Sequence, residues 1–431
     1  MNLEFAFIES SRDADRRRSN IVQELRSFDL FGQKTRESRA LCSGDRDVGV
    51  PVFVNEFWTA RQRQASSLHE VSYRACFKPQ LPRFFIERLT DPGEYVYDPF
   101  MGRGTTLIEA ALLARHPVGN DINPLSVAFT KPRLNPPLWH AIETRLAHIN
   151  FNDPAEMPED LHAFYHPDTL RQISSLKKYL VCQQRNEQLD GVDEWIRMVA
   201  INRLTGHSSG FFSVYTLPPN QAVSIKSQRR INEKRGQTPP QRDVTRIILK
   251  KSRQLLADIT EGVRQTLNRL GPAAVLLTCP ADATPEIPDQ SISLIITSPP
   301  FLNVVQYATD NWLRCWFLGI DAEEVKLTVP SKLADWEIVM NRVFMELSRI
   351  LKPGGHVAFE VGEVHAGTTL LEKTVLSCGL RAGLRPILVL INDQKFTKTA
   401  NCWGVENMSK GTNSNRIVLF QRDDCRPPIR I

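Results

Sequence analysis

The feature that most constrains the fold is a glycine turn between a short apolar segment and the start of a helix. Residues 95–97 read Tyr-Val-Tyr and predict a buried strand, and positions 98–106 continue Asp-Pro-Phe-Met-Gly-Arg-Gly-Thr-Thr. Glycines at such a turn let the backbone pass close to a ligand and aim helix N–H groups at it, and Thr105 and Thr106 can cap the new helix. The sequence therefore predicts a loop that holds a nucleotide-like cofactor.

Strand and helix patterns alternate on both sides of this turn. A helix at 105–115 is followed by later apolar segments that predict strands at 118–120, 273–277, 292–296, 356–360, 386–391 and 416–420. The helix expected at 336–351 ends in Lys-Pro-Gly-Gly at 352–355, which is typical of a helix terminus. This alternation predicts an α/β fold with a mostly parallel sheet covered on both faces.

The alternation is interrupted between Asp121 and Ala273 by helical patterns and a basic segment. An insertion of this size inside a doubly wound fold is expected to be a domain of its own. The expected organisation has three parts. They are a charged, loosely ordered N-terminal arm at 1–50, a catalytic domain formed by 51–130 and 271–431, and a helical, basic domain at 131–270.

An acid downstream of the turn indicates which ligand the loop holds. Asp121 follows Gly104 by 17 positions (121 − 104), at the end of the next expected strand, where an acid meets ribose hydroxyls. The loop lacks the Gly-Lys-Ser/Thr of a triphosphate site and the third glycine of a dinucleotide site, so S-adenosylmethionine fits best. Asp282, after the strand at 273–277, can accept a hydrogen bond from the adenine amino group. In the plainer interpretation the glycines only make a tight turn, Asp121 caps a loop and Asp282 faces solvent.

A second short motif lies far along the chain. The sequence Thr-Ser-Pro-Pro-Phe at 297–301 follows the apolar strand expected at 292–296. It therefore occupies the carboxyl end of a sheet strand, where folds of this kind bind ligands. The alternative is a simple strand terminator, since Pro-Pro also occurs at 218–219 and 239–240.

The residue types of this motif suit methylation of an amino group on a base. An exocyclic amino nitrogen is a poor nucleophile because its lone pair is delocalised into the ring. Two acceptors that grip its hydrogens make the nitrogen more tetrahedral, and Ser298 Oγ and the Pro299 carbonyl are candidates. Pro300 helps to stiffen the loop, and Phe301 can stack on the base. Positioning then supplies much of the rate, and no metal is required.

Charge and composition set the class of partner. The net charge is +6, and ten cations lie between Lys226 and Arg253, opposed only by Glu233 and Asp243. Such clustering favours a polyanion, and a solvated basic loop is the alternative. The eight cysteines show neither zinc-ligand nor redox-pair spacing, and no apolar stretch is long enough to span a bilayer. We expect a cytoplasmic protein with free thiols.

These motifs resemble those of the DNA amino-methyltransferases, particularly the cytosine-N4 group. Residues 98–106 look like the family's cofactor motif and 297–301 like its catalytic motif. Residues 76–82 are similar to the segment that packs on the methionine end of the cofactor, and 351–355 resemble a turn general to this fold. The resemblance implies a seven-stranded, Rossmann-like S-adenosylmethionine-dependent methyltransferase fold with an antiparallel last hairpin. The large insertion would then recognise the DNA target.

Motifs and resemblance together assign the site residues. Those expected to bind the cofactor are Phe77, Asp98, Phe100, Gly102, Gly104, Thr105, Thr106, Asp121 and Asp282. Those expected to carry catalysis are Ser298, Pro299, Pro300 and Phe301. Those expected to bind DNA are Lys226, Arg229, Arg230, Lys234 and Arg235, with Lys395 and Lys398 at the rim of the active site.

The expected function is site-specific transfer of a methyl group from S-adenosylmethionine to N4 of a cytosine that swings out of the DNA helix. Serine before Pro-Pro is typical of cytosine-N4 enzymes, whereas adenine-N6 relatives more often carry Asp or Asn there. Adenine-N6 methylation on the same scaffold is the alternative. RNA guanine-N2 or protein-glutamine methylation and an inactive DNA-binding module are less favoured. The expected partners are double-stranded DNA and a cognate restriction endonuclease acting separately, with no membrane and no metal.

Overall fold

The structure, a computed structural model, describes most of the chain. The described residues are 20–42, 48–59, 65–73, 76–154, 156–216, 222–300, 307–321, 325, 330, 332–361, 371–393 and 414–423.

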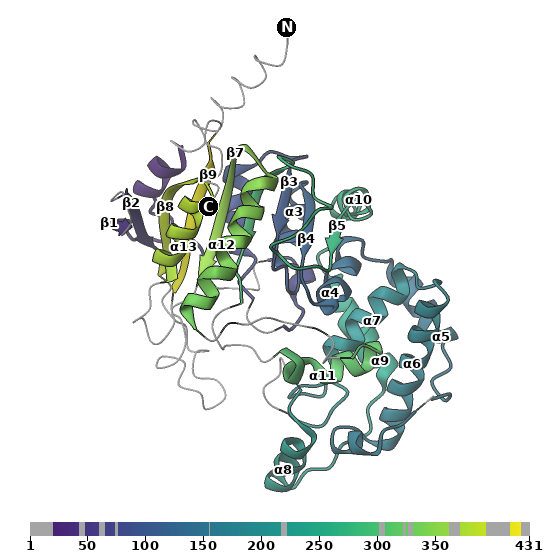
Figure 1. Ribbon diagram of the computed structural model, residues 1–431. Helices are drawn as coiled ribbons and strands as arrows, with labels where there is room; N and C mark the ends of the chain where they lie inside the picture. Colours follow the sequence, from purple (N-terminus) through teal and green to yellow (C-terminus); the bar gives the residue numbers. More distant parts are fainter. Residues whose placement is uncertain are drawn as a thin grey trace.

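A mixed sheet of nine strands forms the centre of the molecule, in the order β1-β2-β8-β9-β7-β6-β3-β4-β5 (Figure 1). The strands are β1 (Arg36–Cys42), β2 (Val48–Asn55), β3 (Tyr95–Asp98), β4 (His116–Asn120), β5 (Val275–Leu277), β6 (Ile292–Thr297), β7 (Leu351–Val361), β8 (Leu384–Asp393) and β9 (Ser414–Arg422). Strands β7, β6, β3, β4 and β5 are parallel neighbours, and β9 runs antiparallel between β7 and β8. This arrangement confirms the α/β fold class and contains the expected seven strands with their antiparallel hairpin.

The range 1–50 expected for the N-terminal arm contains β1 and the first three residues of β2, 48–50. β1 pairs antiparallel with β2, which pairs in parallel with β8. Alternate residues of β2 enter the two faces of the core, with Val50, Val52 and Phe53 all buried. β1 is the edge strand, and its charged sequence suits an edge that must not pair with another chain. That charge made the segment resemble an unstructured arm.

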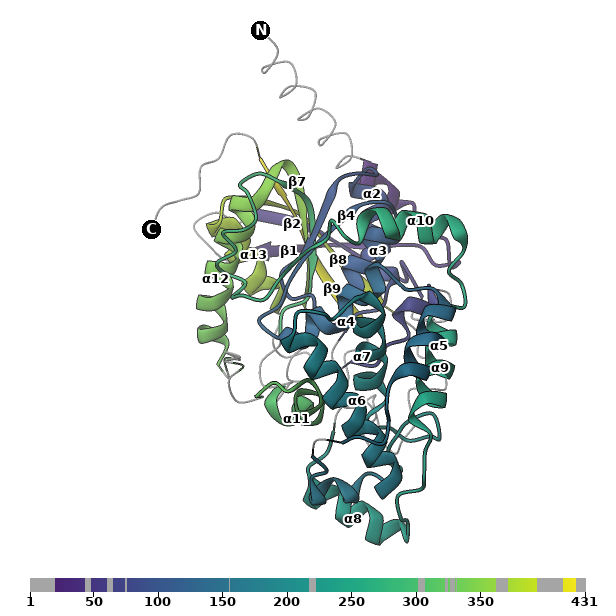
Figure 2. The same ribbon diagram turned by 90° about the vertical axis from the view of Figure 1, so that its right-hand side faces the viewer.

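The helices that cover the sheet lie on both of its faces. α12 (Leu333–Ile350) and α13 (Leu371–Arg381) pack on one face, whereas α2 (Gln80–Leu89) packs on the other and α3 (Thr105–Leu112) lies on the same side (Figure 2). Consecutive strand residues alternate between these layers, as expected for a period of two. Residues 352–355 belong to β7 rather than to a turn, because they form a bulge between the pairs Ile292–Leu351 and Leu294–His356.

A group of helices extends from the β5 side of the sheet (Figure 1). The elements are η2 (Ser67–His69), α4 (Pro124–Leu134), α5 (Trp139–His148), η3 (Glu159–Ala163), α6 (Pro167–Arg185), α7 (Gly191–Arg203), α8 (Ile225–Arg235), α9 (Val244–Leu255), α10 (Glu261–Leu270) and α11 (Tyr307–Leu318). One apolar core runs from Leu107 and Ile108 of α3 through these helices to Leu313 and Phe317 of α11. The inserted stretch is helical, as expected, and it shares its core with the cofactor-loop helix.

Among the described residues, no helix combines the length and the apolar character that crossing a bilayer requires.

Candidate active site at the carboxyl edge of the sheet

The two motifs that stand about 200 residues apart in sequence meet in space. β3 ends at Asp98 and β6 ends at Thr297, and the two strands are parallel neighbours. Thr297 Oγ1 donates to one carboxylate oxygen of Asp98 at 2.6 Å, and Thr106 Oγ1 donates to the other at 2.9 Å. The loop predicted to hold the cofactor (98–106) and the loop predicted to be catalytic (297–301) are therefore joined by a single buried carboxyl group.

Asp98 holds the two loops together from inside the protein. It is 1% exposed and also accepts a hydrogen bond from the Phe100 backbone N–H at 3.1 Å. Burial raises the pKa of Asp98 to about 7, although the hydrogen bonds from Thr297 and Thr106 oppose the rise. Both oxygens of this predicted cofactor residue already accept hydrogen bonds from the protein, so its geometry is that of a connector between loops.

The glycine turn has the backbone conformation that the motif predicted. Gly102 and Gly104 have φ values of 49° and 73°, in the left-handed region that favours glycine. A Cβ on Gly104 would overlap the side chain of Thr130. The expected cap was wrong in one respect, because Gly104 is the N-cap of α3 and no side chain caps this helix. The Thr106 hydroxyl is bonded to Asp98, and the Thr105 hydroxyl accepts from Arg103 Nε at 3.2 Å.

Asp121 lies beside the glycine turn, as its position after β4 predicted. Its carboxylate accepts from the Gly102 N–H at 2.9 Å and from the Asn123 N–H at 3.0 Å. Burial raises the pKa of the Asp121 carboxyl, and these two backbone donors oppose the rise. Each carboxylate oxygen can accept more than one hydrogen bond, so Asp121 retains the capacity to bind hydroxyl groups of a ligand.

The loop after β5 brings Asp282 to the surface of α12. Asp282 forms an ion pair with Arg342 at 3.0 Å, and the Arg342 side chain is 63% exposed. Asn120 ties this loop to the end of β4, since its amide donates to the Cys279 carbonyl at 2.9 Å and accepts from the Cys279 N–H at 3.1 Å. A ligand amino group would share the Asp282 carboxylate with Arg342.

Ser298 is half-buried, and its hydroxyl is hydrogen-bonded to the buried Glu360 near the end of β7. Thr297 at the end of β6 pairs with Phe359 of β7, so the residues that follow them, Ser298 and Glu360, lie next to each other. Glu360 also accepts from Asn415 Nδ2 at 2.6 Å, and burial raises the pKa of its carboxyl group. Sequence reasoning missed Glu360, although its place at the end of the strand expected at 356–360 was a usable signal.

The diproline is fixed by a tryptophan that the sequence did not single out. Pro299 is buried, and the Pro300 carbonyl accepts from Trp336 Nε1 at 3.2 Å. Trp336 is 1% exposed in α12. Phe301 lies outside the described residues.

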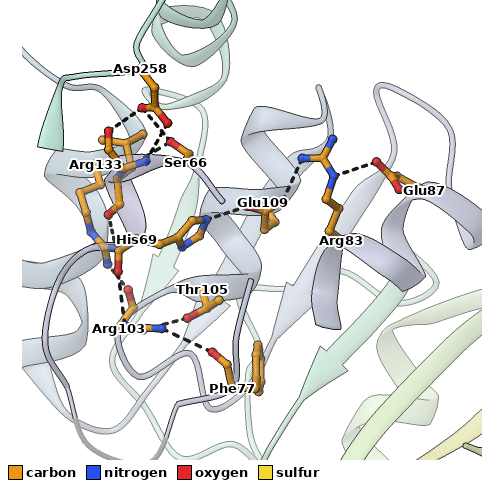
Figure 3. A network of polar contacts seen from close by, with 12 residues as sticks. Ser66, His69, Phe77, Arg83, Glu87, Arg103, Thr105, Glu109, Arg133 and Asp258 are labelled. Atoms are coloured by element: carbon orange, nitrogen blue, oxygen red, sulfur yellow. Dashed lines mark hydrogen bonds and ion pairs between the residues drawn. The ribbon is translucent and has the colours of Figure 1, made fainter. Parts of the chain in front are cut away.

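The segment of residues 65–73 and 76–79, called the bridging segment, is bound to the cofactor loop by buried arginines (Figure 3). Arg103 donates to the carbonyls of Val71 at 2.8 Å, His69 at 3.3 Å and Phe77 at 3.4 Å. Arg133, which is fully buried, donates to the Leu68 carbonyl at 3.0 Å and to the Arg103 carbonyl. The arginine donors satisfy backbone carbonyls of a segment that runs between the sheet and the helices.

The bridging segment places an unforeseen tyrosine near the glycine turn. The Tyr73 hydroxyl accepts from Asn123 Nδ2 at 3.0 Å, and its ring edge lies 3.7 Å from where a Gly102 Cβ would stand. The predicted Phe77 instead packs against the core formed by α2 and one face of the sheet.

The cations predicted to bind DNA divide into three groups. Lys226, Arg230 and Lys234 are exposed on α8. Arg229 pairs with Asp160 at 2.5 Å, and the Arg235 guanidinium lies 3.8 Å from the centre of the Tyr215 ring. Lys395 and Lys398 lie outside the described residues.

Sequence comparisons relate parts of the chain to DNA methyltransferases. The profile of a family described as DNA methylase matches residues 33–131. The type II methyltransferase M.BsoBI of Geobacillus stearothermophilus is 23% identical over 297 residues, which cover 60% of this chain and 54% of that protein. The type II methyltransferase M.MvaI of Kocuria varians is 40% identical over 67 residues, which cover 15% of each chain. The chain thus spans about half the length of the first relative.

Among solved structures, a TehB-like SAM-dependent methyltransferase from Corynebacterium glutamicum matches with a TM-score of 0.30 and 8% identity, covering 79% of this chain and 87% of that one. A TM-score this low supports no argument about the protein.

Proposed function

Since the chain belongs, through residues 33–131, to the DNA amino-methyltransferase family, we propose that it is a site-specific DNA methyltransferase that uses S-adenosylmethionine to methylate the N4 amino group of cytosine. One observation carries this proposal. The Thr297–Asp98–Thr106 hydrogen bonds hold the loop of Ser298 beside the glycine turn, at the edge where open α/β sheets bind ligands.

The residues at the glycine turn fit the cofactor. A turn with two left-handed glycines leaves backbone room for a ligand, and Asp121 beside Gly102 has acceptors for ribose hydroxyls. Tyr73 closes the other side of Gly102. When bound, S-adenosylmethionine supplies an electrophilic methyl group on a positively charged sulfur.

Glu360 prepares Ser298 for its role. The Ser298 hydroxyl donates a hydrogen bond to the Glu360 carboxylate. The lone pairs of the Ser298 oxygen therefore remain free to accept a hydrogen bond from an amino group. Asn415 holds Glu360 from the other side, so the serine is fixed as an acceptor. The Pro299 carbonyl is the second acceptor, and the bond from Trp336 to Pro300 keeps the loop in place. Ser298 is thus the catalytic residue of the proposal, and Glu360 is a positioning residue.

The choice of cytosine is supported by Ser298, the residue before the two prolines of the motif. A neutral hydroxyl with one lone pair directed at the base is a weaker acceptor than a carboxylate, and Ser298 stands where adenine-N6 relatives more often carry Asp or Asn. The cytosine must leave the duplex to reach this edge, as other enzymes that modify bases require.

The test is methylation of DNA by the purified protein, followed by mass analysis of the nucleosides. The proposal expects N4-methylcytosine. If N6-methyladenine is found instead, the protein has the alternative activity, adenine-N6 methylation. The Ser298→Ala variant should lose most turnover while cofactor affinity, measured by calorimetry, stays within about twofold of the wild type. Wild-type protein that fails to bind S-adenosylmethionine would overturn the proposal as a whole, and full activity of the variant would overturn the role of Ser298.

A further inference from the structure

Helix α8 contributes very little to the apolar core. Gln228 is the one residue of this helix that is buried. A polar network attaches the helix, in which Gln228 and Gln237 donate to the Tyr215 carbonyl at 3.1 and 3.0 Å and Asn232 donates to the Ala163 carbonyl at 2.8 Å. Helices in proteins usually gain their stability from an apolar face, so a helix that is polar nearly all round indicates another role for its surface.

The cations of α8 differ in whether another side chain of the protein contacts them. Arg229 pairs with Asp160, and Arg235 stacks on Tyr215, so both are engaged by the protein. All five cations of the helix are exposed, and the other three, Lys226, Arg230 and Lys234, are called the α8 stripe.

The α8 stripe is a row of three like charges on a helix that contains one acid, Glu233. Its members are four residues apart, so they lie on one face of the helix with a rise of about 6 Å between neighbours. None of the ion pairs found among the described residues includes Lys226, Arg230 or Lys234. Like charges at this spacing destabilise an isolated helix, and a bound polyanion would remove that cost.

We propose that the α8 stripe binds the phosphodiester backbone of duplex DNA that flanks the methylated base. The inference rests on the proposed function and names where the substrate is held. Both views place α8 at the far end of the helical group from the sheet, with α11 between them (Figures 1 and 2). The stripe therefore contacts DNA away from the base that enters the Ser298 site. Ammonium and guanidinium groups donate to phosphate oxygens without reading sequence, so the stripe adds affinity rather than specificity.

The test removes the stripe with the substitutions Lys226→Gln, Arg230→Gln and Lys234→Gln in one full-length protein. DNA affinity is measured by fluorescence anisotropy on a duplex of about 30 base pairs between 50 and 200 mM KCl. The slope of log K against log salt is negative, and each lost phosphate contact reduces its magnitude by about 0.9, so the magnitude should fall by about 2 to 3. The association constant for DNA at 100 mM KCl should fall by about tenfold or more.

A matched control variant lowers the net charge by the same amount but on the sheet side of the protein, away from α8. The substitutions Lys34→Gln, Arg39→Gln and Lys373→Gln remove three exposed cations from the sheet side of the protein. Both triple variants lower the net charge from +6 to +3 (6 − 3). The control should change DNA affinity less than about threefold. Equal losses in both variants would show a general charge effect, and no loss in the stripe variant would remove DNA as its partner; either result overturns the inference.

Two further readouts separate this inference from the proposed function. The stripe variant should bind S-adenosylmethionine like the wild type, and its kcat at saturating DNA should be unchanged while KM for DNA rises, as for loss of uniform binding. If the wild type methylates DNA but the stripe variant keeps its affinity and salt slope, the inference fails alone. If the wild type neither binds the cofactor nor methylates DNA, the proposed function fails.

Discussion

Replacing Asp98 with asparagine should make the protein more stable at neutral and alkaline pH. The pKa of Asp98 is about 7 in the folded protein, against an ordinary value of 3.8, because the carboxyl group is buried. An acid whose pKa is raised by folding favours the folded state while it is protonated. That contribution is fully present below about pH 4 and is lost as pH rises through 7.

The size of the effect follows from the shift. A difference of about three units corresponds to about 4 kcal/mol, of which roughly 3 kcal/mol is lost between pH 5 and pH 8.5. Asparagine carries no such penalty, but it can accept from only one of Thr297 and Thr106 through its oxygen. Thr106 already lies 3.3 Å from the Ile296 carbonyl, a second acceptor. The lost hydrogen bond costs about 1–3 kcal/mol, and this cost does not change with pH.

The assay is urea denaturation of the cofactor-free protein from pH 5 to pH 8.5. The free energy of unfolding of Asp98→Asn minus that of the wild type should increase by about 3 kcal/mol across this range. The control is Glu346→Gln. Although burial alone would raise the pKa of Glu346, hydrogen bonds from Arg349 and Thr284 lower it to about 2, so its stabilising effect is constant above pH 5. Its difference curve should be negative and flat. A flat curve for Asp98→Asn would refute the account of its burial.

Three other variants address neighbouring features. Gly104→Ala should lower the free energy of unfolding by about 2–4 kcal/mol, through its left-handed backbone and its overlap with Thr130, and adding Thr130→Ala should recover part of the loss in the same denaturation assay. Trp336→Phe, which removes the bond to Pro300, should lower kcat roughly tenfold while calorimetry finds cofactor affinity unchanged. Glu360→Gln should lower kcat and remove the acidic limb of the pH–rate profile. The wild type needs an ionised Glu360 carboxylate, so its turnover rises with pH through the raised pKa of Glu360. An unchanged acidic limb in the variant would contradict the role of Glu360.

The meeting of the two motifs was predictable because it depends on topology alone. Parallel strands end at one edge of a sheet, so Asp98 and Ser298 had to lie at that edge once their strands were recognised. The register of β3 against β6 then brings Asp98 within hydrogen-bonding distance of Thr297, the residue before Ser298. Local propensity and apolar pattern are therefore sufficient to predict that the two motifs lie at the same edge of the sheet.

The partners of the site residues were not predictable, because they come from elements distant in sequence. Glu360 reaches Ser298 only through the pairing of β6 with β7, and Trp336 reaches Pro300 from a helix. The threonines of the turn were predicted to cap the helix, which is a local role. The Thr106 hydroxyl instead donates a hydrogen bond to the buried Asp98. β1 was missed for a related reason, since an edge strand needs no apolar pattern on its own.

Two buried carboxyl groups stand on β3 and β7, the two strands that flank β6, and both carry a cost to stability. Burial raises the pKa of Asp98 and of Glu360, so each ionised form is disfavoured in the folded protein. Asp98 accepts from Thr297 and Glu360 from Ser298, so consecutive residues of one loop are each held by an acid from a neighbouring strand. An amide would satisfy the packing at either place without the ionisation penalty. Acids retained there despite their cost are expected to serve the reaction, so their amide variants should gain stability at alkaline pH and lose turnover. Loss of both stability and turnover at every pH would instead assign the two acids to the framework of the fold.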